Sequence, residues 1–72
     1  MQKFLVLTMP KDVGVMRLRY IEDTDANGQH IEEYLDSMGD IFWAVFPVSV
    51  PFNRAEQNFQ SYVAFRRQLR HS

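Results

Sequence analysis

The hydrophobic and polar positions of the chain change period several times, and each change predicts an element. Residues 3–9 are apolar at nearly every position, which is typical of a strand buried on both faces. Pro10 ends this strand because proline cannot donate to a sheet ladder. In residues 15–21 apolar side chains alternate with arginines: Met16, Leu18 and Tyr20 against Arg17 and Arg19. Together the two segments predict an antiparallel hairpin with one solvated side.

Residues 29–38 follow a helical period. Their apolar side chains fall at i, i+3, i+4 and i+7 and form one stripe, made of Ile31, Tyr34, Leu35 and Met38. The opposite side is polar and holds Gln29, Glu32, Glu33 and Asp36. Gly39 is well placed as the glycine that ends the helix, and Thr24 or Asp25 is a candidate cap at its start.

Residues 41–50 are the most apolar stretch and predict a third strand, central up to Pro47 and bulged or at an edge beyond it. Asn53 and Glu56 have the spacing of a capping box and predict a helix from Arg54 to about Arg70. Its packed face is expected to hold Ala55, Phe59, Tyr62, Val63 and Leu69. Arg66 projects into that stripe, where it either extends to water or meets an acid.

The element order predicts a single α+β domain over residues 1–72: β-β-α-β-α, with a three-stranded, mainly antiparallel sheet and two helices packed on one face. A chain of 72 residues is near the lower limit for one core, and without cysteine it has no disulfide to help. Because three strands leave two edges, and small domains often gain stability by association, we expect a homo-oligomer, most simply a dimer. Either edge is open to a second copy.

Charge is segregated along the chain, although the net charge is only −1. Acids without any Lys or Arg occupy residues 21–40, whereas arginines dominate from residue 53 onward. One interpretation is two solvated faces, with arginines placed favourably at a helix C-terminus. The other is an acidic face that binds a basic partner protein, for example as an inhibitor of a nucleic-acid-handling protein. That face is predicted to contain Glu22, Asp23, Asp25, Glu32, Glu33 and Asp36.

Residues 23–28, Asp-Thr-Asp-Ala-Asn-Gly, place three oxygen-bearing side chains at alternate positions before a glycine. This stretch resembles the first half of an EF-hand calcium loop, over residues 23–34. The resemblance implies a metal site with side-chain oxygens from Asp23, Asp25 and Asn27 and the backbone carbonyl of Gln29. The sequence departs from that pattern at His30, Ile31 and Tyr34, the last of which replaces the closing glutamate. The alternative is an Asx-type turn and helix cap.

Other chemistry finds little support. The arginines Arg17, Arg19, Arg66, Arg67 and Arg70 are candidate nucleic-acid contacts, but nucleic-acid-binding domains are usually strongly basic. There is no cysteine nucleophile, no serine lies in a glycine elbow, and the glycines are isolated. Neighbours on a helix, such as Glu32 and Glu33, do not face one another as a catalytic pair must. We expect no enzymatic activity, no cofactor, no membrane segment and a cytoplasmic location.

Overall fold

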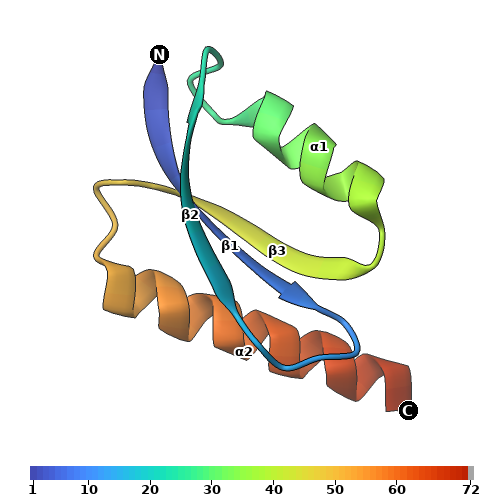
Figure 1. Cartoon of the computed structure of the whole chain (residues 1–72). Coiled ribbons are helices and arrows are strands. Elements are labelled where there is room, and N and C mark those ends of the chain that lie inside the picture. The colour runs from blue at the N-terminus through green and yellow to red at the C-terminus, as the bar shows by residue number, and fades with distance from the viewer. Residues whose placement is uncertain (72) are drawn as a thin grey trace.

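The computed structural model describes the backbone of residues 1–71 and the side chains of residues 1–69. Five elements follow one another along the chain (Figure 1): β1 (Gln2–Pro10), β2 (Arg17–Asp23), α1 (Gln29–Met38), β3 (Ile41–Pro47) and α2 (Phe52–His71). The predicted α+β class and the order β-β-α-β-α are therefore confirmed. Within the described part of the chain, no helix combines the length and the apolar character needed to cross a membrane.

The sheet has the strand order β2-β1-β3, and both of its pairings are antiparallel. β1 is the central strand, with Phe4 opposite Ile21 of β2 and Pro47 of β3. Its side chains are buried on both faces, as predicted: Leu5, Val6 and Leu7 are at most 2% exposed. The prediction that β3 is central was wrong. β3 is apolar because helices cover both of its faces, although it lies at an edge.

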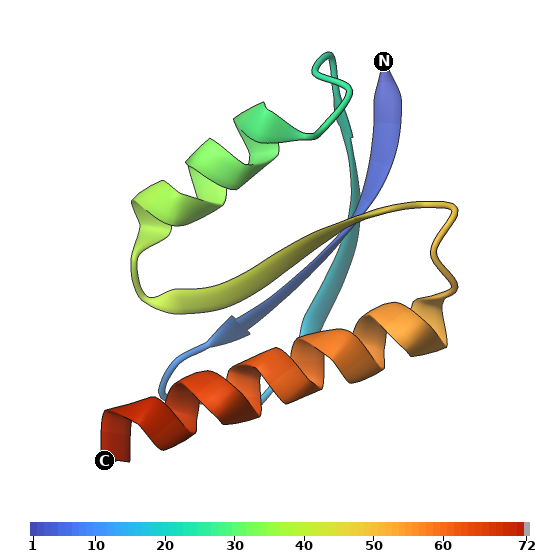
Figure 2. The same cartoon turned by 180° about the vertical axis from the view of Figure 1, so that it is seen from behind.

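The two helices cover opposite faces of the sheet (Figures 1 and 2), which corrects the prediction that both pack on one face. One cluster joins odd-numbered residues of β1 to α2, and its buried members are Leu5, Leu7, Met9, Phe42, Ala55, Phe59 and Val63. The other joins even-numbered residues of β1 to α1 and contains Phe4, Val6, Ile31 and Leu35. The reason is alternation along a strand: β1 is apolar at both parities, so each of its faces needs a cover.

The apolar stripes of both helices are narrower than predicted. In α1 only Ile31 and Leu35 are buried, whereas Tyr34 is 60% exposed and Met38 is 46% exposed. In α2 the predicted face is buried at Ala55, Phe59 and Val63, while Tyr62 and Leu69 are more than two-fifths exposed. Arg66 is also exposed, which is the first of its two predicted alternatives. Each helix contacts the sheet through a single line of side chains and leaves aromatic flanks in solvent.

The start of α2 differs from the predicted capping box. The helix begins at Phe52, and the carbonyl of Pro51 accepts the N–H groups of Arg54 and Ala55 at 3.1 and 3.0 Å. The side chain of Asn53 accepts only the N–H of the next residue, Arg54, at 2.9 Å. Proline ahead of the first turn leaves its carbonyl free to act as the cap acceptor, so Asn53 lies inside the helix and not before it.

Candidate functional site

The junction between β2 and α1 is organised by one buried carboxylate. Asp23 is 4% exposed. Its Oδ1 accepts the N–H of Asp25 at 2.9 Å, and its Oδ2 accepts those of His30 and Ile31 at 3.0 and 3.2 Å. These last two belong to the first turn of α1, where N–H groups have no partner within the helix. The interpretation of the Asp23–Gly28 motif as a turn and helix cap is confirmed, with one correction: Asp23, and not the predicted Thr24 or Asp25, accepts these two N–H groups.

Asp25 builds the turn itself. Its Oδ2 accepts the N–H groups of Asn27 at 2.9 Å and Gln29 at 3.1 Å, and its carbonyl accepts the N–H of Gly28 at 3.2 Å. Gly28 has a φ of 71°, a left-handed conformation that glycine adopts at low cost. It is also buried, and a Cβ added at this position would lie 3.4 Å from the side chains of both Phe4 and Val45. The motif therefore turns the chain sharply enough to place α1 against the sheet.

Asp23 and His30 form an ion pair when the imidazole is protonated, with Nδ1 of His30 2.7 Å from Oδ1 of Asp23. The N–H of Asp25, together with the hydrogen bonds from His30 and Ile31, lowers the pKa of Asp23 to about 2, against the opposing effect of burial. In the same way the hydrogen bond to Asp23 raises the pKa of His30. The carboxylate is thus ionised throughout the physiological range, and it favours the charged imidazole.

This geometry bears directly on the calcium alternative. Both oxygens of Asp23 already accept N–H groups, and so does Oδ2 of Asp25. Within the part of the chain that the structure describes, no group of three or more His, Cys, Asp or Glu side chains is placed to hold a metal ion. Two of the four donors that the EF-hand resemblance assigns to a cation, the carboxylates of Asp23 and Asp25, are directed at backbone N–H groups instead.

The six residues of the predicted acidic face do not all lie together. Asp23 is buried, and Asp25 is half-buried in its turn. Glu22 is exposed, but it pairs across the strands with Lys3 and, by alternation, lies on the face of the sheet that α2 covers. The remaining three, Glu32, Glu33 and Asp36, are exposed on the outer side of α1. We call these three residues the acidic face of α1.

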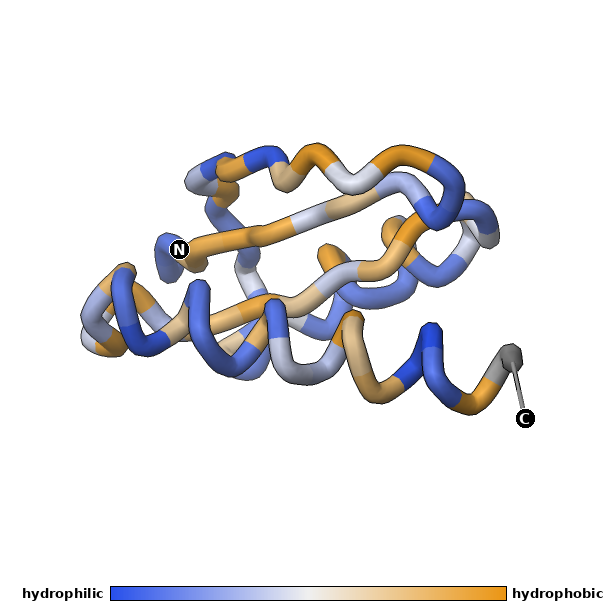
Figure 3. The backbone as a smooth tube through the Cα atoms, turned by 90° about the horizontal axis from the view of Figure 1, so that it is seen from below, coloured by the Kyte–Doolittle hydropathy of each residue, from blue (hydrophilic) through white to orange (hydrophobic). Residues whose placement is uncertain are grey.

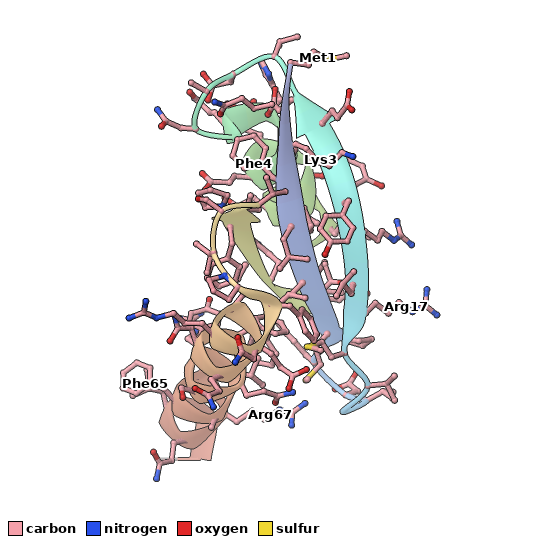
Figure 4. The ribbon with its side chains drawn as sticks, turned by 90° about the vertical axis from the view of Figure 1, so that its left-hand side faces the viewer. Met1, Lys3, Phe4, Arg17, Phe65 and Arg67 are labelled. Carbon is pink, nitrogen blue, oxygen red and sulfur yellow. The ribbon has the colours of Figure 1, made fainter. Side chains whose placement is uncertain are left out.

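The predicted arginine set is also divided. Arg17 and Arg19 line a groove of about 150 Å³ between β2 and α1, with Tyr34 and Met38 on its other wall. Arg66 and Arg67 belong to α2, on the opposite face of the sheet, and Figure 4 shows Arg17 and Arg67 on different elements. Arg67 is engaged within the fold, 5.7 Å from the centre of the Phe42 ring. The side chain of Arg70 lies outside the described residues.

Sequence reasoning missed an aromatic surface beside β3. A groove of about 370 Å³ runs between β3 and α2, lined by Trp43, Ala44, Phe46, Asn58, Phe59 and Tyr62. Tyr62 is 43% exposed and meets the ring of Phe42 edge-on at 6.4 Å. Phe65, one turn further on, is 58% exposed and projects on the β3 side of the molecule (Figure 4). The sequence held a signal for this surface, because Tyr62 and Phe65 lie at the margin of the apolar stripe of α2, where side chains are less buried than at its centre.

Comparisons of the chain with models of protein families, with curated proteins and with solved structures find no match.

Proposed function

We propose that the protein is a non-enzymatic interaction module whose acidic face on α1 binds a basic surface of another protein. The observation that carries the proposal is the exposure of all three carboxylates, Glu32, Glu33 and Asp36, with no cation among the described side chains within ion-pair distance of them. Glu33 accepts a hydrogen bond from Nε2 of Gln29 at 3.1 Å, but that amide is neutral, so all three carboxylates keep their charge for a binding partner. Complementary charge accelerates association and selects among partners.

The local structure supports this use of α1. Asp23 fixes the first turn of the helix, and the left-handed glycines Gly28 and Gly39 bound it at each end. Ile31 and Leu35 anchor its inner side in the sheet. The backbone that carries the three carboxylates is therefore held before a partner arrives, which reduces the entropy lost on binding.

The chemistry of the acidic face also narrows the class of partner. Proteins that bind DNA or RNA carry lysine and arginine surfaces for the phosphate backbone. A helix with three closely spaced carboxylates presents to such a surface the same negative charge that the phosphate backbone of a nucleic acid presents. We therefore propose that the protein inhibits a nucleic-acid-handling protein by occupying the surface that the nucleic acid needs.

The test is a charge reversal with a matched control. One variant combines Glu32→Lys, Glu33→Lys and Asp36→Lys; the control reverses three acids elsewhere on the chain, Asp12, Asp40 and Glu56, and changes the net charge equally. Each protein is immobilised and used to capture partners from the native host, with circular dichroism to verify folding. We expect the wild type and the control to capture the same basic protein and the α1 variant to lose it. Equal capture by the α1 variant would contradict the proposal.

A second measurement tests inhibition itself. Fluorescence anisotropy of a labelled oligonucleotide bound to the captured partner should fall when the wild-type protein is added, because α1 displaces the oligonucleotide. The same assay without the partner tests direct binding of nucleic acid by this chain. A salt-dependent rise in anisotropy that is lost in Arg17→Glu or Arg66→Glu would favour the nucleic-acid alternative over the acidic face.

A further inference from the structure

We propose that the outer edge of β3 is a homodimerisation site, where two copies of the chain pair their β3 strands antiparallel about a two-fold axis between the two Trp43 residues. This inference concerns a different surface from the acidic face of α1 and does not depend on it. Figure 2 shows β3 passing between α1 and α2 with its outer edge covered by neither helix. The edge has no strand beyond it in the three-stranded sheet.

The hydrogen-bond register determines which backbone groups this edge presents. The N–H of Lys11 donates to the carbonyl of Asp40 at 3.1 Å, just beyond the last paired residues of β1 and β3. Hydrogen-bonded and non-bonded pairs alternate in an antiparallel ladder. Counting from that pair, the even residues of β3 bond to β1, and the odd residues Ile41, Trp43 and Val45 direct their N–H and C=O groups outward.

Pro47 agrees with this parity and limits the edge. It is the next odd residue, and it has no N–H to offer, so its place on the outer side costs the sheet no hydrogen bond. Its carbonyl is already taken by the N–H of Val50 at 3.0 Å. The free edge therefore consists of three residues with a full set of donors and acceptors, and Trp43 is the middle one.

The edge formed by Ile41, Trp43 and Val45 can pair with the same edge of a second copy, because its three outward residues are arranged symmetrically about Trp43. A two-fold axis at Trp43 places the two Trp43 residues opposite each other. It also places Ile41 of each copy opposite Val45 of the other copy. Every outward N–H then meets an outward C=O. An axis at Ala44 instead places Ile41 opposite Pro47, which has no donor. Because an isologous interface must be complementary to itself, the Trp43 register is the one that uses the whole edge.

Charge distinguishes this edge from the other one. β2 carries four charged residues in seven, and charged side chains on an edge strand are a common protection against pairing. β3 carries none, and neither does the chain onward as far as Asn53. Identical β3 strands can therefore meet without opposing like charges. Figure 3 shows the same contrast: hydrophilic and hydrophobic residues alternate along β2, whereas β3 has no strongly hydrophilic residue.

The surface beside the edge continues the apolar character of β3. A two-fold axis perpendicular to the sheet places the α2 helices of the two copies on one face, so the exposed rings of Tyr62 and Phe65 flank the joined strands. On the other face the two Trp43 side chains lie next to each other across the new ladder, and aromatic pairs between strands are favourable. The two α1 helices also share that face, so we expect dimerisation to strengthen with salt as carboxylate repulsion is screened.

The central test uses the self-pairing of Trp43. In Trp43→Lys and in Trp43→Glu each substituted residue would face a like charge in the dimer, whereas in an equimolar mixture of the two it would face an opposite charge. By sedimentation equilibrium we expect wild type to be a dimer of the 8.5 kDa chain. Each variant alone should dissociate at least tenfold more readily, and the mixture should form a heterodimer. The matched control is Tyr20→Lys on β2. Tyr20 lies opposite Leu5, whose backbone bonds to β3, so the N–H and C=O of Tyr20 point outward at the other edge. This variant should leave the dimer unchanged.

A second variant probes the hydrogen bonds. Val45→Pro removes an outward N–H without removing any bond between β1 and β3, so the monomer should keep its circular dichroism spectrum and lose the dimer. A monomeric wild type at millimolar concentration would overturn the proposal, and so would a dimer that withstands both Trp43→Lys and Val45→Pro. A dimer lost in Tyr20→Lys but retained in Trp43→Lys would place the contact at β2 and would overturn it as well. None of these readouts involves the partner of the acidic face.

Discussion

α1 and α2 cover opposite faces of one sheet, and they are held there by different means. α2 has 20 residues and buries Ala55, Phe59 and Val63 at 0–3% exposure against odd-numbered residues of β1. α1 has 10 residues and buries only Ile31 and Leu35. What α1 lacks in packing it gains at its ends, where Asp23 accepts two N–H groups of its first turn.

The difference shows how a small domain stabilises a short helix. An isolated helix of ten residues is marginal in water because nucleation costs about 4 kcal/mol. The burial of two side chains contributes roughly 3–6 kcal/mol and does little more than offset that cost. A fixed acceptor at the N-terminus satisfies N–H groups that are otherwise unpaired and also interacts favourably with the helix dipole. We therefore expect α2 to respond most to the loss of apolar volume and α1 to respond most to changes at its ends.

The largest effect is expected on the α2 side. Phe59→Ala removes the largest fully buried side chain and should cost about 3–5 kcal/mol, against a total stability of about 4–11 kcal/mol for a domain of this size. Urea unfolding followed by circular dichroism measures the loss. Phe65→Ala on the same helix is the control: its ring is 58% exposed, so the change should stay within about 0.5 kcal/mol. Equal losses in the two variants would contradict the assignment of the core.

The next largest effect is expected at the start of α1. Asp23→Ala leaves the N–H groups of His30 and Ile31 without their acceptor, and we expect the melting temperature to fall by roughly 10 °C. Asp36→Ala, on the exposed side of the same helix, should change it by no more than about 2 °C. Amide hydrogen exchange adds the local test, since His30 and Ile31 should exchange faster while the amides of α2 keep their protection. Uniformly faster exchange would contradict a local role for Asp23.

The sequence predicts the five elements better than it predicts how they are arranged around the sheet. The periods of the apolar residues identify all five elements, because local alternation and helical spacing are properties of neighbouring residues. The sheet order and the faces that the helices cover depend on distant contacts. The apolar run of β1 nevertheless contained part of the answer: a strand that is apolar at both parities must be covered on both faces, although β3 shows that such a strand need not be central. Helices on one face do not meet that requirement.

In the candidate sites, too, the sequence predicts the local features and not the contacts between residues that are distant in the chain. The Asp-x-Asp-x-Asn-Gly spacing is enough to predict a turn before α1, because Asx turns are local. It does not reveal that Asp23 reaches His30 and Ile31, seven and eight residues further along, since that contact depends on how the turn folds back. The free edge of β3 is also invisible to local patterns. A strand apolar at both parities looks central, and only its place in the sheet shows that one side is unpaired.

A smaller effect is expected at the glycines that bound α1. Gly28 and Gly39 have φ values of 71° and 69°, so alanine at either position is strained and should cost about 1–2 kcal/mol. Gly14 is the control, because it has neither a positive φ nor any atom within 4 Å of an added Cβ, and Gly14→Ala should be neutral or slightly stabilising. Thermal unfolding ranks the three variants. A loss in Gly14→Ala as large as in Gly28→Ala would contradict the explanation from φ.

The smallest effect is the pH dependence that Asp23 and His30 confer on folding. The pKa of Asp23 is lowered from 3.8 to about 2, so its contribution is present above pH 3.8 and is lost as the pH falls through 2. The pKa of His30 is raised above 6.5, so its contribution is complete below pH 6.5 and is lost as the pH rises through the folded-state pKa. Together the two groups stabilise α1 most between about pH 4 and 6.

Nuclear magnetic resonance titration separates this pair from the background of other titrating groups. The ring of His30 should titrate above 6.5 in the wild type and move back towards 6.5 in Asp23→Asn, because that variant removes the charge that favours the imidazolium. In thermal unfolding, His30→Gln should abolish the loss of stability that the wild type shows as the pH rises above 6.5, since that loss requires a titrating ring beside Asp23. Because His30 is largely exposed, solvent screening keeps that loss to a few degrees. An unchanged pH profile in His30→Gln would show that the ion pair with His30 adds no stability to the capping of α1.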